Sequence, residues 1–298
     1  MSLPEPPLPD QPPVAPPEPA EPGPPDVAAL LRDVLRGRRR LRPGRVAIVR
    51  LYGTIGGGAR AADWVETVRR LRDARGVPAV VLDIDSPGGS AAASDYLYLA
   101  LGRLAAAKPL VAHVRGTGAS GAYLAAMAAR RVIVAPASIV GSIGVISAGP
   151  RVPALLDRLG VRVEERRAGR LKGMGAPWRD DTDEERAREQ ALVDAFYEVF
   201  VRRVADGRHL PRERVLDLAT GEVWLGERAV ELGLADETGD LARAIDVAAD
   251  LAGVPPKAQP VRLHRPLLAR LADRVATRLS AGLAAELEAA IWRRDPRA

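Results

Sequence analysis

The stretch that decides the fold is PAVVLDIDSPGG, residues 78–89. Its first half is a continuous apolar run, which is typical of a strand covered on both faces in a parallel sheet. Its second half places two glycines after a proline, which predicts a sharp turn out of that strand. Residues 109–121, PLVAHVRGTGASG, have the same order of apolar strand and glycine-rich turn. Both stretches indicate an α/β protein with a largely parallel sheet.

The neighbouring segments alternate in the same way. We expect further strands over residues 46–51, 131–135 and 161–165, and helices over residues 62–74, 91–106, 122–129 and 152–159. A long helix is expected over residues 182–205 because Thr182 and Glu185 have the spacing of a capping box, and another over residues 239–251. The alternation predicts βαβ crossovers within one main domain, residues 45–254.

Both ends differ in composition from this domain. The first 25 residues hold 12 of the 26 prolines, so residues 1–28 are expected to be a disordered tail. Residues 29–44 are rich in arginine and form a basic segment. Residues 255–298 are expected to be an extension with an amphipathic helix, which could dock on the core, on another subunit or on a membrane surface. No signal peptide or membrane span is recognised, so we expect a cytoplasmic protein, with peripheral membrane contact left open.

Composition excludes several classes of function. The chain is 47% hydrophobic and 28% charged, as in soluble globular proteins. It has no cysteine and only three widely spaced histidines, so we expect no thiol nucleophile and no metal site. The net charge is +6, but only 4% of residues are aromatic, which leaves no stacking surface for single strands. No nucleic-acid partner is therefore expected.

Residues 116–121 fit the dinucleotide fingerprint G-x-G-x-x-G. The fingerprint also needs an acidic residue about 20 positions further on. No Asp or Glu lies between Gly121 and Asp157, so we expect no dinucleotide. Ser120, inside this segment, lies where a strand turns into a helix. It could be a nucleophile or could simply cap the helix.

A serine nucleophile needs a base and an oxyanion hole. Backbone amides near Gly89 could supply the hole, although the same glycines could serve only a tight turn. The histidines are poorly placed as bases, since His113 lies in the strand before Ser120 and His209 follows 89 residues later. Lysine is the other choice, because a buried amine can become neutral whereas guanidinium stays protonated.

Only three lysines occur, and the other 41 of the 44 basic residues are arginine. Lys108 and Lys257 are interpreted as ordinary loop residues. Lys172 lies in a glycine-rich loop, from which it could reach a cleft. We regard it as the candidate base, with a plain surface role as the alternative.

Four ordered segments carry a resemblance to a known family. They are DSPGG at residues 85–89, ASGAY at 119–123, GSIGV at 141–145, and Gly169 with Lys172. The pattern resembles signal peptide peptidase A in its short, single-repeat form, over about residues 46–251. The resemblance implies a Clp-protease/crotonase-like fold of repeated ββα units and a serine peptidase with a Ser-Lys dyad. It implies Ser120 as nucleophile, Lys172 as general base, Ser142 as the hydroxyl that orients the lysine nitrogen, and the amides of Gly89 and Gly121 as the oxyanion hole.

The same resemblance implies the partners. Substrates would be signal peptide remnants or other peptides and unfolded proteins, and the dyad would form between neighbouring subunits of a ring-shaped homo-oligomer. No cofactor is implied. Alternatives are a crotonase-type acyl-CoA enzyme and a non-catalytic scaffold that binds a membrane surface or nucleic acid through residues 36–45 and the last helix. A Ser-His-Asp protease is disfavoured, because no histidine follows Ser120 within 80 residues.

Overall fold

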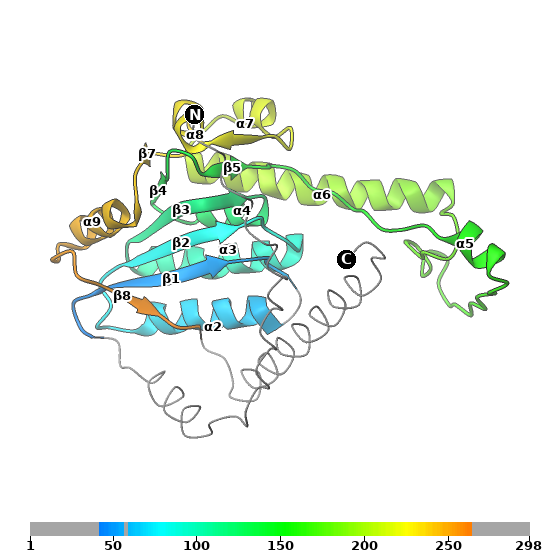
Figure 1. Cartoon of the computed structure of the whole chain (residues 1–298), viewed down its shortest axis with the longest axis horizontal. Helices are drawn as coiled ribbons and strands as arrows, with labels where there is room; N and C mark the ends of the chain where they lie inside the picture. Colours follow the sequence, from blue (N-terminus) through cyan, green and yellow to red (C-terminus); the bar gives the residue numbers. More distant parts are fainter. Residues whose placement is uncertain (1–41, 57–58, 264–298) are drawn as a thin grey trace, which may run out of the picture. The chain divides into compact units, whose positions relative to one another are not determined.

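The structure, a computed structural model, describes residues 42–56 and 59–263 (Figure 1). The expected tail over residues 1–28, most of the basic segment and the helix expected beyond residue 263 lie outside the described residues. All described residues belong to the same one of the two units into which the chain divides.

An eight-stranded sheet organises this unit, in the order β6-β5-β3-β2-β1-β8, with β4 paired to β3 and to β7. The strands are β1 Val46–Tyr52, β2 Val80–Ser86, β3 Leu110–Ala119, β4 Arg131–Val134, β5 Ile139–Gly141, β6 Val223–Leu225, β7 Glu237–Thr238 and β8 Ala258–Val261. Every pairing is parallel except β5 with β6. The predicted α/β fold with a largely parallel sheet is confirmed.

Helices cover both faces of the sheet (Figure 1). One face carries α2 Ala59–Asp73, α3 Ala91–Ala107 and α4 Gly121–Ala126, and the other carries α9 Leu241–Ala252. In β1 the side chains alternate, so Val49 and Leu51 pack toward α2 and α3 while Val46 and Ile48 pack toward α9. Burial on both faces explains why the central strands are almost wholly apolar.

The other helices are α5 Pro153–Arg158, α6 Asp183–Arg208, α7 Arg212–Leu218 and α8 Gly226–Glu231. The capping box predicted at the start of α6 is present, with Thr182 Oγ1 accepting from the backbone N–H of Glu185 at 3.2 Å. Near its end, α6 buries Phe200, Val201 and Val204. Its first half continues past the sheet toward α5 (Figure 1). In the part of the chain that is described, no helix is long and apolar enough to cross a bilayer.

Residues 147–182, which we call the arm, form most of the connection between β5 and α6. The strand predicted over residues 161–165 is wrong, because this segment pairs with no other strand and its residues are exposed. A β-branched sequence forms a strand only where a partner supplies hydrogen bonds and cover. Within the arm only Gly173 and Ala176 are buried. The arm is therefore a segment without an apolar core of its own.

Two boundaries differ from those expected. β3 continues through Gly116 and Gly118 to Ala119, so most of the segment expected to be a glycine-rich turn is strand. β8 lies beyond residue 254, where we expected the main domain to end, and it pairs with β1 through Val261. The sheet thus includes residues that the sequence assigned to the extension.

Candidate active site

Ser120 lies between the end of β3 and the first residue of α4. Its backbone is held at φ 52° and ψ −125°, a region that non-glycine residues seldom adopt, and its N–H donates to Gly141 O at 2.8 Å. The side chain makes no capping hydrogen bond to α4. The helix-cap interpretation is therefore wrong, and the geometry is that of a serine on a sharp strand-to-helix turn.

Gly89 and Gly121 lie where no side chain fits. A Cβ atom on Gly89 would be 1.8 Å from Ile55 O, and one on Gly121 would be 2.1 Å from Ser94 Oγ. The same Cβ position on Gly121 lies 3.6 Å from the amide nitrogen of Gly89, so the two turns are in close contact. Within the described residues, neither amide N–H has a backbone acceptor. Two amide donors beside a serine are what an oxyanion hole requires.

A cavity of about 690 Å³ opens beside these groups. Its polar lining includes Ser120, Gly89, Gly121 and Ser142, so the fold brings together four of the five site residues expected from the sequence. Ser142 is fixed by its own strained backbone, at φ 51°, and by the hydrogen bond from its N–H to Glu222 O at 2.7 Å. The cavity also has an apolar wall that sequence reasoning missed, made by Leu124, Val145, Ile146, Phe196 and Phe200.

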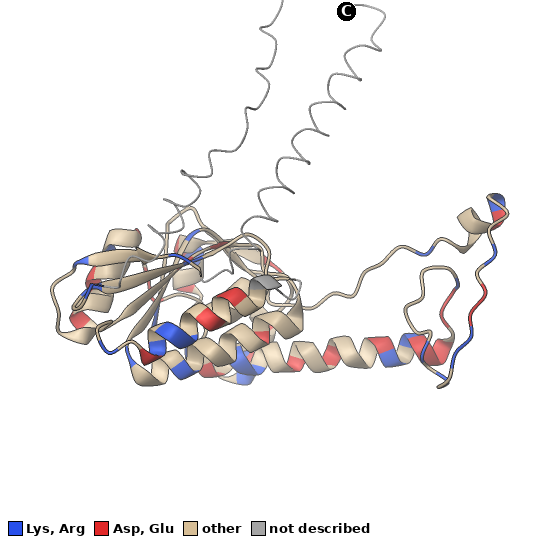
Figure 2. Ribbon diagram, turned by 90° about the horizontal axis from the view of Figure 1, so that it is seen from below, with Lys and Arg blue, Asp and Glu red and all other residues tan. Residues whose placement is uncertain are grey.

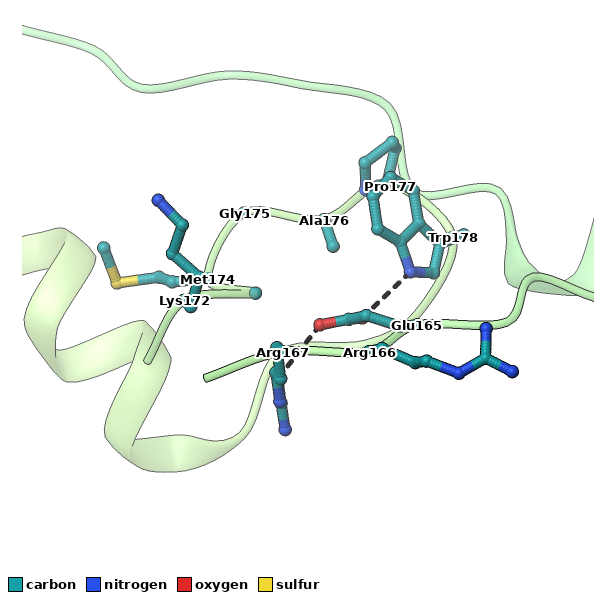
Figure 3. A pocket seen from close by; sticks show the side chains of 10 residues that line it. Glu165, Arg166, Arg167, Lys172, Met174, Gly175, Ala176, Pro177 and Trp178 are labelled. Atoms are coloured by element: carbon teal, nitrogen blue, oxygen red, sulfur yellow. Dashed lines mark hydrogen bonds and ion pairs between the residues drawn. The ribbon is translucent and has the colours of Figure 1, made fainter. Parts of the chain in front are cut away.

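Lys172 lies elsewhere, in the arm. It lines a second cavity of about 410 Å³ together with Glu165 and Trp178 (Figure 3). Figure 3 shows its side chain directed away from the Glu165 carboxylate, which accepts from Trp178 Nε1 at 3.2 Å. The lysine is exposed. A single copy of the chain therefore does not bring Lys172 to Ser120.

Lys108 has a structural role that the sequence interpretation missed. Its Nζ donates to three carbonyl oxygens around the end of α2, those of Leu71 at 2.7 Å, Ala74 at 2.9 Å and Val77 at 3.0 Å. Burial lowers the pKa of Lys108. Lys108 does not line the cavity of Ser120, so it is a helix-capping lysine and no ordinary loop residue.

His113 and Asp83 are the buried members of a polar cluster on the α9 face of the sheet. Its Nδ1 lies 2.8 Å from Asp83 Oδ1, and the same carboxylate accepts from Tyr52 at 2.5 Å and Arg115 at 2.9 Å. Burial by itself would raise the pKa of Asp83, but hydrogen bonds from His113, Tyr52 and Arg115 outweigh it and lower the pKa to about 2. Along β1, β2 and β3, every second side chain points to the same face of the sheet. This alternation in the sequence is the signal by which the cluster could have been predicted. His113 is held by Asp83 and does not line the Ser120 cavity.

A serine on a sharp turn at the end of a strand, beside two amide donors, is an arrangement that can stabilise the oxyanion formed when a nucleophile attacks a carbonyl group. The chain belongs to Peptidase family S49, whose pattern matches residues 103–255. It is 32% identical to the Serine protease SPPA, chloroplastic, of Arabidopsis thaliana, over 74% of this chain and 35% of that protein. It is also 32% identical to Protease 4 of Salmonella typhi, over 70% of this chain and 35% of that protein.

Other relatives differ in length. The slr0021 protein of Synechocystis sp. is 34% identical over 76% of this chain and 82% of its own length. The chain thus spans about a third of two relatives and most of the third. A solved ClpP1 mutant from Listeria monocytogenes is similar with 16% sequence identity and a TM-score of 0.48, over 72% of this chain and 98% of that one.

Proposed function

We propose that this protein is a serine endopeptidase that cleaves peptides through an acyl-enzyme, with Ser120 as nucleophile and Lys172 as general base. The observation that carries the proposal is the strained, uncapped Ser120 beside the amides of Gly89 and Gly121. One peptidase domain would carry this activity, with the proline-rich tail and the helical extension outside it.

The chemistry follows from these groups. A neutral Lys172 amine takes the Ser120 hydroxyl proton as Oγ attacks the peptide carbonyl carbon. The carbonyl oxygen becomes an oxyanion that accepts from the amides of Gly89 and Gly121. Collapse of this intermediate breaks the C–N bond, and the protonated lysine gives its proton to the leaving amine. Water then hydrolyses the acyl-enzyme, with the lysine again as base and the Ser142 hydroxyl orienting its nitrogen.

The separation of Ser120 and Lys172 supports a dyad formed between copies of the chain. The arm that carries Lys172 exposes large apolar side chains, which a partner would cover; these are Leu155, Leu159, Val161 and Val163. Burial of a lysine amine against a partner also favours its neutral form. We therefore propose a homo-oligomer, ring-shaped as in the family, in which the arm of one copy reaches the Ser120 cavity of the next.

The apolar wall of the cavity indicates the kind of substrate. Phe196 and Phe200 from α6 face the same space as Ser120, so an apolar side chain near the scissile bond would be buried there. Remnants of signal peptides are rich in such residues, and we propose them, or other apolar peptides and unfolded segments, as substrates.

The acyl-CoA alternative requires a carboxylate that acts in the cavity. Asp95 lines the cavity, but its Oδ1 lies 3.4 Å from Arg203 Nε and is engaged in that ion pair. The scaffold alternative rests on residues that lie mostly outside the described part of the chain. The site therefore favours the peptidase.

Complementation between inactive variants tests the proposal. We expect Ser120→Ala and Lys172→Ala each to lose peptide hydrolysis when purified alone. Co-expressed with two different affinity tags and purified through both, the mixed oligomers should regain part of the activity, because some interfaces then pair an intact Ser120 with an intact Lys172.

A mixed oligomer without activity would contradict a dyad formed between copies. A Ser120→Ala protein that still hydrolyses peptides would contradict the nucleophile. Thioester hydrolysis that survives Ser120→Ala would instead favour the acyl-CoA enzyme.

A further inference from the structure

We infer that Arg179 is a positioning residue for Lys172, and that Glu185 holds Arg179 in place for this purpose. The inference rests on the proposed function, because it assigns these side chains to the placement of the proposed base.

The arm needs such a device because it has almost no buried apolar side chains. Between Gly144 and Glu184 only Gly173 and Ala176 are buried. Figure 2 shows acidic and basic residues next to each other at the start of α6, where the arm ends. Hydrogen bonds and ion pairs therefore have to replace apolar packing in fixing the loop that carries Lys172, which we call the lysine loop.

Arg179 joins this loop to α6. Its Nη2 donates to Gly173 O at 2.7 Å and to Glu185 Oε1 at 2.6 Å, while its Nη1 donates to Glu185 Oε2 at 2.8 Å. The bond to Gly173 O holds the residue that follows Lys172. Two parallel bonds to one carboxylate fix the orientation of the guanidinium as well as its position.

Glu185 is the fixed end of this connection. Its side chain is only 3% exposed, and it accepts from the Thr182 N–H at 2.9 Å as part of the capping box. The hydrogen bond from Arg179 is the main cause that lowers the pKa of Glu185 to about 2, so the carboxylate stays charged at neutral pH. The lysine loop is thereby tied to the first turn of a 26-residue helix.

Gly173 shows how closely the charged groups surround the loop. A Cβ atom there would lie 2.5 Å from Glu165 Oε1, 2.7 Å from Arg167 Nη1 and 2.8 Å from Arg179 Nη2. These charged groups surround the Gly173 backbone, and loss of Arg179 would remove the hydrogen bond to Gly173 O.

Arg179→Gln tests the inference. We expect kcat for a peptide to fall about 10- to 100-fold with KM within about twofold of wild type, because a misplaced base slows the chemical step and leaves substrate binding intact. The matched control is Arg228→Gln. Arg228 pairs with Glu231 within α8 and belongs to neither the arm nor the lining of the Ser120 cavity, so kcat should stay within about twofold.

Glu185→Gln separates positioning from helix capping. Glutamine can still take part in the capping box, but it loses the charge that holds Arg179. We expect the same fall in kcat and an unchanged elution volume, together with a lower thermal midpoint because the charge that pairs with Arg179 is lost. Arg179→Lys, whose single ammonium cannot hold Gly173 O and both carboxylate oxygens together, should recover part of kcat.

The outcomes distinguish this inference from the proposed function. If Lys172→Ala abolishes hydrolysis while Arg179→Gln keeps full kcat, positioning by Arg179 is wrong and the lysine base stands. If Lys172→Ala keeps its activity, the proposed base itself is wrong. If Arg179→Gln dissociates the oligomer and Glu185→Gln keeps both assembly and full kcat, Arg179 serves assembly and the inference is also wrong.

Discussion

Ser120 and Lys172 line two different cavities, the first at the end of β3 and the second in the arm. The Ser120 cavity is lined by Gly89, Gly121 and Ser142, and none of the described residues that line it is a lysine or a histidine. The lysine loop is fixed by its own charged residues, and what it lacks is a nucleophile. Assembly is therefore the condition for activity in the mechanism proposed above, and the following predictions address its separate parts.

Ser120→Ala should abolish peptide hydrolysis without loss of stability. The Ser120 side chain makes no capping hydrogen bond, and alanine can occupy the same backbone conformation no worse than serine. We expect the urea midpoint to stay within error while the rate falls to background. Covalent labelling by a serine-directed acylating probe should disappear in the same variant, and labelling that persists would contradict the assignment.

Lys172→Arg should reduce kcat by several orders of magnitude. Arginine keeps the positive charge but cannot supply a neutral amine near pH 7. Steady-state rates of the two proteins check this, and a variant within about tenfold of wild type would contradict the lysine base.

Gly121→Ala should impair both stability and catalysis. The added Cβ would lie 2.1 Å from Ser94 Oγ, so either the helix or the turn must move. We expect a loss of about 1–3 kcal/mol in the free energy of unfolding and a fall in kcat as the two amides separate. Urea denaturation and steady-state kinetics measure these effects.

Gly102→Ala is the matched control for Gly121→Ala. Gly102 lies in α3, and its Cβ position meets nothing within 4 Å. Alanine should stabilise this helix by about 1 kcal/mol and leave kcat unchanged. If both alanines behaved alike, close packing at Gly121 would not be the cause.

Lys108→Met should destabilise the fold without changing kcat. Methionine keeps an apolar stem but removes the three hydrogen bonds to the carbonyls around the end of α2. We expect a loss of about 1–3 kcal/mol, measured by urea denaturation. Lys257→Met, at an exposed lysine, should have no measurable effect, and equal losses in both variants would contradict the capping role.

Asp83 should make stability depend on pH at the acidic end. Its pKa is about 2 in the folded protein against an ordinary value of 3.8, so its contribution is complete above about pH 4 and is lost as pH falls toward 2. We expect Asp83→Asn to be less stable than wild type at pH 7, with the difference shrinking between pH 4 and pH 2. Urea midpoints at several pH values measure this, and a constant difference would contradict the assignment.

Much of the fold was predictable because its signals are local. Continuous apolar runs identified β1, β2 and β4, the spacing of Thr182 and Glu185 identified the start of α6, and the glycines around Ser120 identified its turn. Each signal depends on residues a few positions apart, for which period and turn chemistry are reliable guides. The short strands β5 to β8 carry too few residues for such a pattern.

Long-range contacts decided the rest. Residues 161–165 have the composition of a strand but no partner strand, and Lys108 finds its acceptors 31 to 37 residues away along the chain. The sequence indicated only that His113 is poorly placed as a base. The structure shows that a carboxylate 30 residues earlier holds it, because neighbouring parallel strands place the two side by side. Sequence placed Ser120 and Lys172 in turns with the right chemistry, but the distance between two such turns depends on the packing of the elements that separate them.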